Sequence, residues 1–209
     1  MGKKIKTILF DFDGTIADTM KKAIEIYNQL ALKNNFILVD KNNLIKLRNK
    51  KPLEILKILH IPLRKLPSIA NKIRKELKSS LGEISTFNGI QETLLEIKQL
   101  HYKIGIISTN NRDNIQLFLE YNNLCYFDFI FSGKKMFGKH RLLKKVIKKN
   151  DLSVDEIIYI GDEIRDIDAC RKVGIKIISV CWGYNDKDSL MRENAGFIVE
   201  KPAEILKCL

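Results

Sequence analysis

The sequence predicts an α/β protein, with a doubly wound parallel sheet and an inserted all-helical domain. From residue 87 onward, short apolar runs alternate with segments of helical periodicity, a pattern that calls for parallel strands joined by helices. Residues 17–86 interrupt this alternation, because they show helical periodicity without a convincing strand. The length of 209 residues suffices for one sizeable core and a small inserted module.

The expected strands are short apolar runs bounded by polar residues or glycine. Residues 4–10 (KIKTILF) alternate and then become fully apolar, which is typical of a strand that enters the core. Five later runs have the same character: residues 103–107, 127–131, 157–160, 176–180 and, less clearly, 196–199. In a parallel sheet the carboxyl ends of the strands share one edge, and ligands bind beyond that edge. The residues that follow each strand are therefore the candidate functional residues.

The expected helices repeat apolar residues every three or four positions. Between the strands they cover residues 90–100, 112–122, 139–150, 164–173 and 188–194. Within the inserted segment they cover residues 17–33, 40–47, 52–59 and 63–81. We therefore expect an α/β core made of residues 1–16 and 87–209, and a helical domain made of residues 17–86.

Composition excludes several classes of protein. Hydrophobic residues make up 45% and charged residues 30%, as in a globular chain rather than a disordered or collagen-like one. No apolar stretch approaches the roughly 18 residues of a membrane span, and the N-terminus lacks the apolar region of a signal peptide. The four cysteines show no CxxC pattern, which argues against a disulfide framework or a cysteine zinc site. We expect a cytoplasmic protein without a membrane partner.

The formal net charge of +12 favours an anionic partner, such as a phosphorylated metabolite, nucleic acid or an acidic surface. Residues 17–86 hold 15 Lys and Arg against 6 Asp and Glu, so the inserted segment carries +9 and the rest of the chain +3. The alternative is that these lysines only solvate helix faces.

Two carboxylates follow the first expected strand. Asp11 and Asp13 project to the same side if the strand geometry continues, and Gly14 lets the chain turn closely around what they hold. This pair suits a cation or acid–base work. The alternative is a simple turn or helix cap, in which Asp is also common.

Polar residues also follow two other expected strands. Ser108, Thr109 and Asn110 follow one of them and offer donors for a phosphoryl oxygen, or else a helix cap. Gly161 and Asp162 end another, and Asp166 follows one turn later, where acids also suit a helix dipole. Taken together, Asp11, Asp13 and Asp162 would provide the hard oxygen ligands that Mg²⁺ prefers.

These motifs, DFDGTIADT, IISTN and GDEIRD, resemble in order and spacing the signature motifs of the haloacid dehalogenase superfamily. The resemblance implies a Rossmann-like core and Mg²⁺-dependent phosphoryl transfer through an aspartyl-phosphate. It implies that Asp11 is the nucleophile and that Asp13 is the acid–base residue. The metal would be held by Asp11, the backbone carbonyl of Asp13 and the side chain of Asp162. Asp166 would hold a metal-bound water or orient a lysine.

The resemblance also implies an active-site lysine between the second and third motifs. Lys139 is the best match because the helical pattern starts with it, although relatives often have Lys-Pro where this chain has Lys139-His140. Lys134 or Lys135 is the alternative. Superfamily similarity further implies Ser108 as a phosphate ligand, or Thr109 after a one-residue shift, with Asn110 as a further contributor. Thr15 would support the phosphate turn or have a purely structural role.

The inserted segment resembles the helical cap of phosphoglycolate phosphatase-like members of the superfamily. Arg48, Lys50 and Lys51 lie in an expected interhelical loop where such relatives place substrate contacts, and the alternative is that they are solvated loop residues. The implied substrate is a small phosphorylated metabolite, phosphoglycolate-like or a sugar phosphate.

Two other functions compete with this one. One is a phosphomutase of the β-phosphoglucomutase type. The other is a nucleic-acid-end phosphatase or binding module that uses the basic insert. The insert offers two aromatic residues, Tyr27 and Phe36, too few for a base-stacking platform, so nucleic acid is not the expected partner. A monomer or a homodimer is expected.

Overall fold

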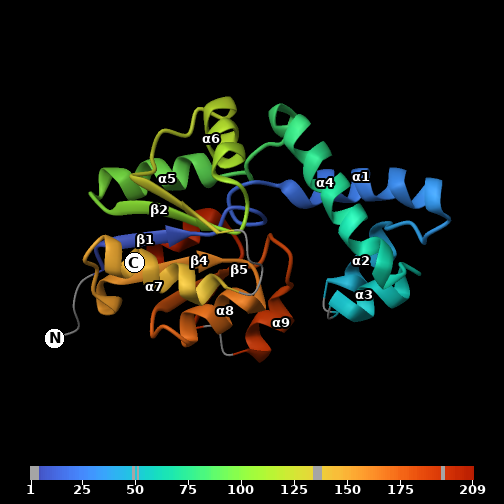
Figure 1. Cartoon of the computed structure of the whole chain (residues 1–209). Coiled ribbons are helices and arrows are strands. Elements are labelled where there is room, and N and C mark those ends of the chain that lie inside the picture. The colour runs from blue at the N-terminus through green and yellow to red at the C-terminus, as the bar shows by residue number, and fades with distance from the viewer. Residues whose placement is uncertain (1–4, 49, 51, 134–137, 194–195) are drawn as a thin grey trace. The chain divides into compact units, whose positions relative to one another are not determined.

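The computed structural model describes residues 5–48, 50, 52–133, 138–193 and 196–209. The chain forms two compact units, one made of Met1–Asp18 and Ser85–Leu209 and the other of Thr19–Ile84 (Figure 1). The helical unit thus starts and ends two residues further in than expected. The reason is local pairing, because Ala17 bridges both Asp13 and Thr86, and the N–H of Asp18 donates to the carbonyl of Ser85 at 3.0 Å.

The first unit contains six parallel strands in the order β3-β2-β1-β4-β5-β6. The strands are β1 (Thr7–Phe10), β2 (Lys103–Ser108), β3 (Phe129–Ser132), β4 (Ile157–Gly161), β5 (Lys176–Val180) and β6 (Phe197–Val199). This confirms the predicted fold class. Phe10, the last residue of β1, pairs with Ile106 of β2 on one side and Ile160 of β4 on the other. The three sequence motifs therefore leave the sheet at the same edge.

Helices cover both faces of this sheet. They are α5 (Ile90–Gln99), α6 (Arg112–Tyr121), α7 (Lys139–Lys149), α8 (Ile164–Arg171) and α9 (Lys187–Arg192). α5 and α6 lie on one face, and α7 and α8 lie on the other (Figure 1). The chain moves outward from β1 to β3 and then crosses back to β4, so right-handed crossovers place the two sets of helices on opposite faces.

Two short 3₁₀ helices in this unit were not predicted, η3 (Val154–Glu156) and η4 (Pro202–Cys208). η4 packs against α5. This helix is too short to show a clear helical periodicity in the sequence, and the proline at its start is typical of a turn. Sequence periodicity thus detects the longer helices and misses these.

The core lies on both sides of β1. On one face Leu9, Ile107 and Tyr159 pack against apolar side chains of α7 and α8, and all three are fully buried. At the end of β1 the ring of Phe12 meets that of Phe118 edge-on, with centroids 5.0 Å apart. Burial of each aliphatic or phenylalanine side chain in this core stabilises the folded state by about 1.5–3 kcal/mol. This packing holds the loop that follows β1 in a fixed place.

Gly105 in β2 leaves no room for a side chain. A Cβ atom there would lie 2.1 Å from the ring of Phe129 on the neighbouring strand. We expect Gly105→Ala to reduce the free energy of unfolding by about 1–3 kcal/mol, because the aromatic ring must move out of its packed position. Urea unfolding followed by circular dichroism measures the change.

Gly82 provides the matched control for this substitution. A Cβ atom at Gly82 would meet nothing within 4 Å. Gly82→Ala should therefore leave the unfolding midpoint unchanged or raise it slightly, because alanine reduces the conformational entropy of the unfolded chain. Equal unfolding midpoints for the two variants would show that Gly105 has no steric role.

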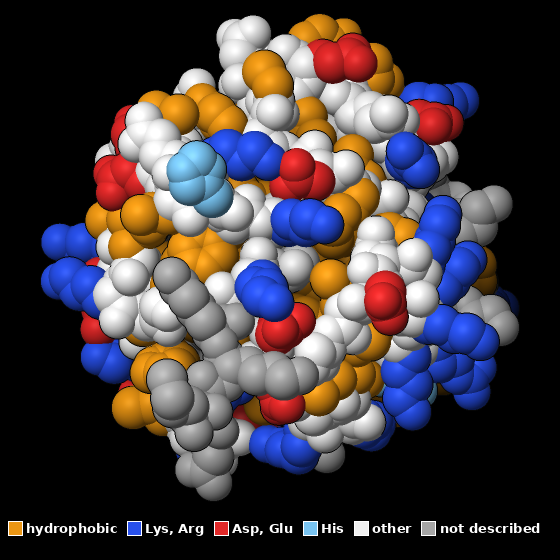
Figure 2. Space-filling model, turned by 90° about the vertical axis from the view of Figure 1, so that its left-hand side faces the viewer, with side chains coloured by type: hydrophobic (Ala, Val, Ile, Leu, Met, Phe, Trp, Pro, Cys, Tyr) orange, Lys and Arg blue, Asp and Glu red, His pale blue; other side chains and the backbone are white. Residues whose placement is uncertain are grey.

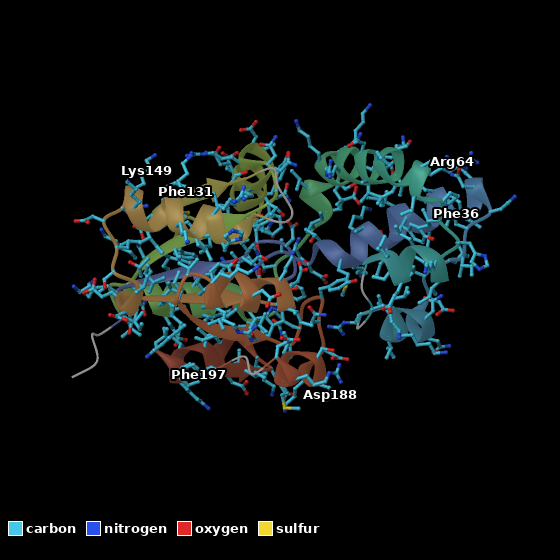
Figure 3. The ribbon with its side chains drawn as sticks, turned by 60° about the horizontal axis from the view of Figure 1, so that its bottom comes forward. Phe36, Arg64, Phe131, Lys149, Asp188 and Phe197 are labelled. Atoms are coloured by element: carbon cyan, nitrogen blue, oxygen red, sulfur yellow. The ribbon has the colours of Figure 1, made fainter. Side chains whose placement is uncertain are left out.

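A lysine side chain lies beside the edge strand β3 of the sheet. Lys149, at the end of α7, places its Nζ 5.4 Å from the ring centroid of Phe131 on the edge strand β3 (Figure 3). A short edge strand beside a lysine is a common protection against edge-to-edge pairing.

On the face drawn in Figure 2, Lys and Arg side chains are interspersed with acidic and apolar side chains, and more of the Lys and Arg side chains lie toward the right-hand border.

The second unit is helical. Its elements are α1 (Thr19–Asn34), α2 (Lys41–Leu47), α3 (Pro52–Ile58), η1 (Leu63–Lys65), α4 (Leu66–Ser79) and η2 (Leu81–Glu83). Its own core contains Tyr27, Ala31, Val39, Leu47, Leu56, Leu59, Ile61 and Ile69. Asp40 caps α2, since its side chain accepts from the N–H of Asn43 at 2.8 Å. Phe36 lies beside η1 (Figure 3), with the Nζ of Lys65 5.2 Å from its ring centroid.

The single helix expected over residues 63–81 is instead divided into η1, α4 and η2. Pro67 stands in the first turn of α4. Proline lacks an N–H and is tolerated at such a position, whereas it would break a helix in its interior. The proline therefore marks a helix start within a continuous apolar pattern.

No helix in the described part of the chain has both the length and the apolar character needed to cross a membrane. The four cysteines, Cys125, Cys170, Cys181 and Cys208, are all free.

Candidate active site

The first carboxylate of the site stands directly after β1. The N–H of Asp11 donates to the carbonyl of Ile160 at 2.8 Å, which continues the strand pairing for one more residue. Its Oδ1 accepts from the N–H of Phe12 at 2.8 Å, so the side chain turns back over its own loop. Asp11 is 3% exposed. The loop therefore holds this carboxylate in a fixed orientation at the edge of the sheet.

Lys139 joins two of the predicted aspartates. Its Nζ lies 2.6 Å from Oδ2 of Asp11 and also donates to Oδ1 of Asp166. Lys139 is the first residue of α7 and is 4% exposed, so its ammonium group is buried with these partners. The alternatives Lys134 and Lys135 lie outside the described residues. The geometry thus brings Lys139 to the acidic residues, where the superfamily resemblance implies an active-site lysine.

Asp162 is held from two directions. Thr15, in the loop after β1, donates its hydroxyl to Oδ1 at 2.8 Å, and the N–H of Tyr184, in the loop after β5, donates to Oδ2 at 2.7 Å. Cβ atoms at Gly14 and Gly183 would both lie 2.3 Å from a carboxylate oxygen of Asp162. Both loops therefore need glycine to pack their backbones against it.

The loop after β5 also belongs to the site, although the sequence singles out none of its side chains as a ligand. Tyr184 contributes through its backbone N–H, which no side-chain pattern in the sequence encodes. The residue after it, Asn185, accepts from the N–H of Ile164 at the start of α8 with its Oδ1 at 2.9 Å. The sequence does offer one signal for this loop, because Gly183 is a glycine that closely follows a buried strand.

Three carboxylates converge here, and their arrangement fits a divalent cation. Among the described residues, Asp11, Asp162 and Asp166 each place an oxygen within 4.8 Å of the others, and all three are buried. Among the described residues the ammonium group of Lys139 contacts Asp11 and Asp166, and three ionised carboxylates carry two more negative charges than this one group balances. Buried charges need partners, and Mg²⁺ prefers oxygen ligands of this kind. The carboxylate of Asp13 is not a member of this group.

Burial dominates the ionisation of these groups. It raises the pKa of Asp11 from its ordinary value to about 7, against the opposing effect of the ammonium group of Lys139. Burial also raises the pKa of Asp162 well above its usual range, and the negative charge of Asp11 raises it further. For Lys139, burial by itself lowers the pKa, but Asp11 and Asp166 outweigh it and the pKa rises. The lysine therefore stays charged, while the carboxylates lack enough neighbouring positive charge to balance their own negative charge.

Asp13 faces the loop that follows β2. Asn110 donates its side-chain N–H to both carboxylate oxygens of Asp13, at 3.2 and 3.1 Å. Ser108 is buried, and its Oγ accepts from the N–H of Asn110 at 2.9 Å. Thr109 between them is half-buried. The structure thus brings the second motif to the first, and it gives Asn110 an aspartate as its partner.

The predicted substrate contacts in the insert belong to the other unit. Arg48 directly follows α2 and is half-buried, and Lys50 is exposed. Lys51 lies outside the described residues. Their role as substrate contacts stays a prediction.

The fold and the site define the class of this protein: an α/β enzyme whose buried acidic centre lies beyond the carboxyl ends of the central strands. The chain belongs to the haloacid dehalogenase-like hydrolase family, whose model matches residues 8–180.

Individual relatives cover nearly the whole chain. It is 27% identical to the phosphoglycolate phosphatase of Synechococcus elongatus, over 98% of this chain and 97% of the relative. It is 25% identical to the pyrophosphatase PpaX of Bacillus mycoides, over 99% of this chain and 97% of the relative. A haloacid dehalogenase-like family hydrolase from Streptococcus pneumoniae has the same fold, with a TM-score of 0.82, 22% identity and 98% of each chain covered.

Proposed function

We propose that this protein is a Mg²⁺-dependent phosphatase that hydrolyses a small phosphorylated metabolite through an aspartyl-phosphate on Asp11. The observation that carries the proposal is the buried contact between Asp11 and Lys139, at 2.6 Å, inside a cluster of three carboxylates. A carboxylate fixed beside an ammonium group can meet a phosphate dianion without full charge repulsion.

The first step forms the phosphoenzyme. An oxygen of Asp11 forms a bond to phosphorus while the bond from phosphorus to the ester oxygen of the substrate breaks. Asp13 in its acid form gives its proton to that oxygen, and the alcohol leaves. Lys139 stabilises the negative charge on the group in transfer, and Ser108 is proposed as a donor to a phosphoryl oxygen, with Thr109 as the alternative.

The second step releases phosphate. The carboxylate of Asp13 takes a proton from a water molecule as the water oxygen bonds to phosphorus. The bond between phosphorus and Asp11 breaks, and Asp11 regains its carboxylate. Asp13 ends the cycle protonated, ready for the next ester. The same residue thus acts as acid and then as base.

We propose that Asp11, Asp162 and Asp166 hold Mg²⁺, together with the backbone carbonyl of Asp13. The ion would neutralise the excess negative charge of the cluster and of the phosphoryl group. Thr15 acts indirectly, since its hydroxyl orients the carboxylate of Asp162 at 2.8 Å.

Metal binding should depend on pH because Mg²⁺ competes with protons for Asp11. Folding without metal raises the pKa of Asp11 from 3.8 to about 7, so the folded state binds a proton that the unfolded state has lost. Stability of the metal-free protein therefore falls as pH rises from about 4 to about 7. We expect Mg²⁺ to raise the thermal midpoint more at about pH 8 than at about pH 5.5, because metal ligands must be deprotonated.

Differential scanning fluorimetry with and without Mg²⁺ at both pH values measures this effect. Asp11→Asn removes the competing proton of this residue and should reduce the pH dependence of the Mg²⁺ effect, while the buried Asp162 still contributes to that dependence. An equal rise in the midpoint at both pH values in the wild type would contradict the assignment of the cluster as the metal site.

The substrate class rests on the relatives and on the charge of the insert. One relative bears the name of a phosphatase for phosphoglycolate and another that of a pyrophosphatase. Both names denote small substrates with a second anionic group. The predicted helical segment, residues 17–86, carries a net charge of +9 and is proposed as a cap, with Arg48 and Lys50 as contacts for such a group. The enzyme is proposed to act in the cytoplasm, where its four cysteines stay reduced.

A phosphate-release assay tests the proposal. The panel contains p-nitrophenyl phosphate, phosphoglycolate, sugar phosphates, pyrophosphate and an oligonucleotide with a terminal phosphate, each with Mg²⁺ or with EDTA. Release that needs Mg²⁺ and is fastest on a small substrate with two anionic groups supports it. The absence of Mg²⁺-dependent release from every compound contradicts it, and fastest release from the oligonucleotide would overturn the substrate class.

A further inference from the structure

Asn110 makes a contact that its expected role does not explain. Its side-chain nitrogen lies 3.2 Å from Oδ1 and 3.1 Å from Oδ2 of Asp13, a residue 97 positions earlier in the chain. We infer that Asn110 positions the acid–base residue Asp13, rather than binding the phosphoryl group. This inference rests on the proposed function.

The orientation of the Asn110 amide is fixed by its other contacts. Its Oδ1 accepts from the N–H of Asn111 at 2.7 Å and from the side-chain nitrogen of Asn114 at 3.3 Å. A backbone N–H can only donate, so it must face the oxygen of the amide. The nitrogen of the amide is then the atom that faces Asp13.

The backbone of Asn110 is held as well. Its N–H donates to Oγ of Ser108 at 2.9 Å, and its carbonyl accepts from the hydroxyl of Ser132 at the end of β3. Ser108 is the last residue of β2 and is buried, so the contact with Asp13 starts from the rigid sheet. Two strand ends thus fix a side chain that in turn fixes the carboxyl group of Asp13.

This contact matters because the reaction uses Asp13 twice. In the first step the proton of Asp13 moves to the ester oxygen, and in the second step Asp13 takes a proton from water. Both transfers need the carboxyl group at hydrogen-bond distance and in one orientation. A donor that spans both oxygens keeps that orientation whether the proton is present or not. A phosphate ligand would instead direct its N–H groups at the phosphoryl oxygens.

The dependence of the rate on the leaving group separates the two roles. Cleavage of p-nitrophenyl phosphate needs little proton donation because its phenolate is a good leaving group, whereas an alkyl phosphate needs the proton of Asp13. For Asn110→Ala, we expect single-turnover cleavage of the best alkyl phosphate of the panel to slow about 10–100-fold more than cleavage of p-nitrophenyl phosphate. KM should change little for either ester.

Two further variants complete the experiment. Asn110→Asp keeps the volume of the side chain but replaces its donor with an acceptor, and it should show the same loss even if Asn110→Ala folds poorly. Asn111→Ala is the matched control: it removes the cap of α6, which accepts from the N–H of Asp113 at 3.0 Å, and keeps the N–H that Asn110 accepts from. It should retain the rate ratio of the wild type.

Equal slowing of both esters in Asn110→Ala and Asn110→Asp, or a rise in KM with an unchanged rate ratio, would overturn the inference and indicate a phosphate ligand. Failure of the proposed function looks different, because the wild type itself would then release no phosphate from any ester. Active wild type with an unaffected rate ratio in the variants refutes the role of Asn110 alone.

Discussion

Asp11→Asn should lower Mg²⁺-dependent phosphate release by about a thousandfold or more, because an amide cannot form the covalent phosphoenzyme. The fold should survive this change. Asparagine has the size of aspartate and can still accept from the N–H of Phe12, and the substitution removes one of three crowded carboxylates. We therefore expect the thermal midpoint of the metal-free variant to equal or exceed that of the wild type at neutral pH.

The two readouts are the rate of phosphate release and the thermal midpoint. Asp168→Asn is the matched control, because this exposed aspartate of α8 pairs with Arg171 on the surface and should have no effect on turnover. Substantial turnover by Asp11→Asn would refute Asp11 as the nucleophile. Loss of turnover together with a collapse of stability would leave the chemistry to be tested by trapping the phosphoenzyme in the wild type.

Lys139→Met should have the opposite effect on stability. It removes the ammonium group that contacts Asp11 and Asp166, and it leaves both carboxylates buried without their partner. Breaking a buried ion pair from one side costs about 3–5 kcal/mol. Turnover should also fall, by about 10²–10³-fold, because a preorganised cation at the transferring phosphoryl group is lost. At low pH the loss of stability should be smaller, because protonated carboxyl groups need no counter-charge.

Urea unfolding at two pH values and steady-state kinetics measure these changes. Lys144→Met is the matched control, with the same substitution on an exposed position of the same helix, α7. It should lie within about 0.5 kcal/mol of the wild type. Equal unfolding midpoints for Lys139→Met and Lys144→Met would show that the buried lysine contributes nothing to the stability of the site.

The sheet and the first and third motifs could be predicted because their signals are local. A buried strand shows as an apolar run, and its end shows where polar residues begin, so Asp11 and Asp162 could be placed at one edge without coordinates. The superfamily resemblance implied an active-site lysine, and the start of a helical pattern favoured Lys139 over Lys134 and Lys135. The helix expected over residues 63–81 starts too early, because the apolar periodicity is continuous across the break that Pro67 indicates. The short η4 was missed because its periodicity is weak.

The partners within the site could not be predicted, because they join distant parts of the chain. Asn110 meets Asp13 across 97 residues, and Tyr184 meets Asp162 through a backbone N–H across 22. The sequence indicates that these residues lie at strand ends but not which way each one turns. For Asp162, that choice depends on the loop backbones that pack against its carboxylate at Gly14 and Gly183.

The pairing of Ala17 with Thr86 has a consequence for how this protein can change. The chain leaves the α/β unit at Asp18 and re-enters it at Ser85 through adjacent, hydrogen-bonded positions. In terms of chain entropy, the helical unit is therefore a long loop between two positions that are already hydrogen-bonded to each other. Doubling the length of such a loop costs only about 0.6 kcal/mol of closure entropy. The segment is therefore an exchangeable module, and evolution or design can replace it while the strands and their aspartates stay intact.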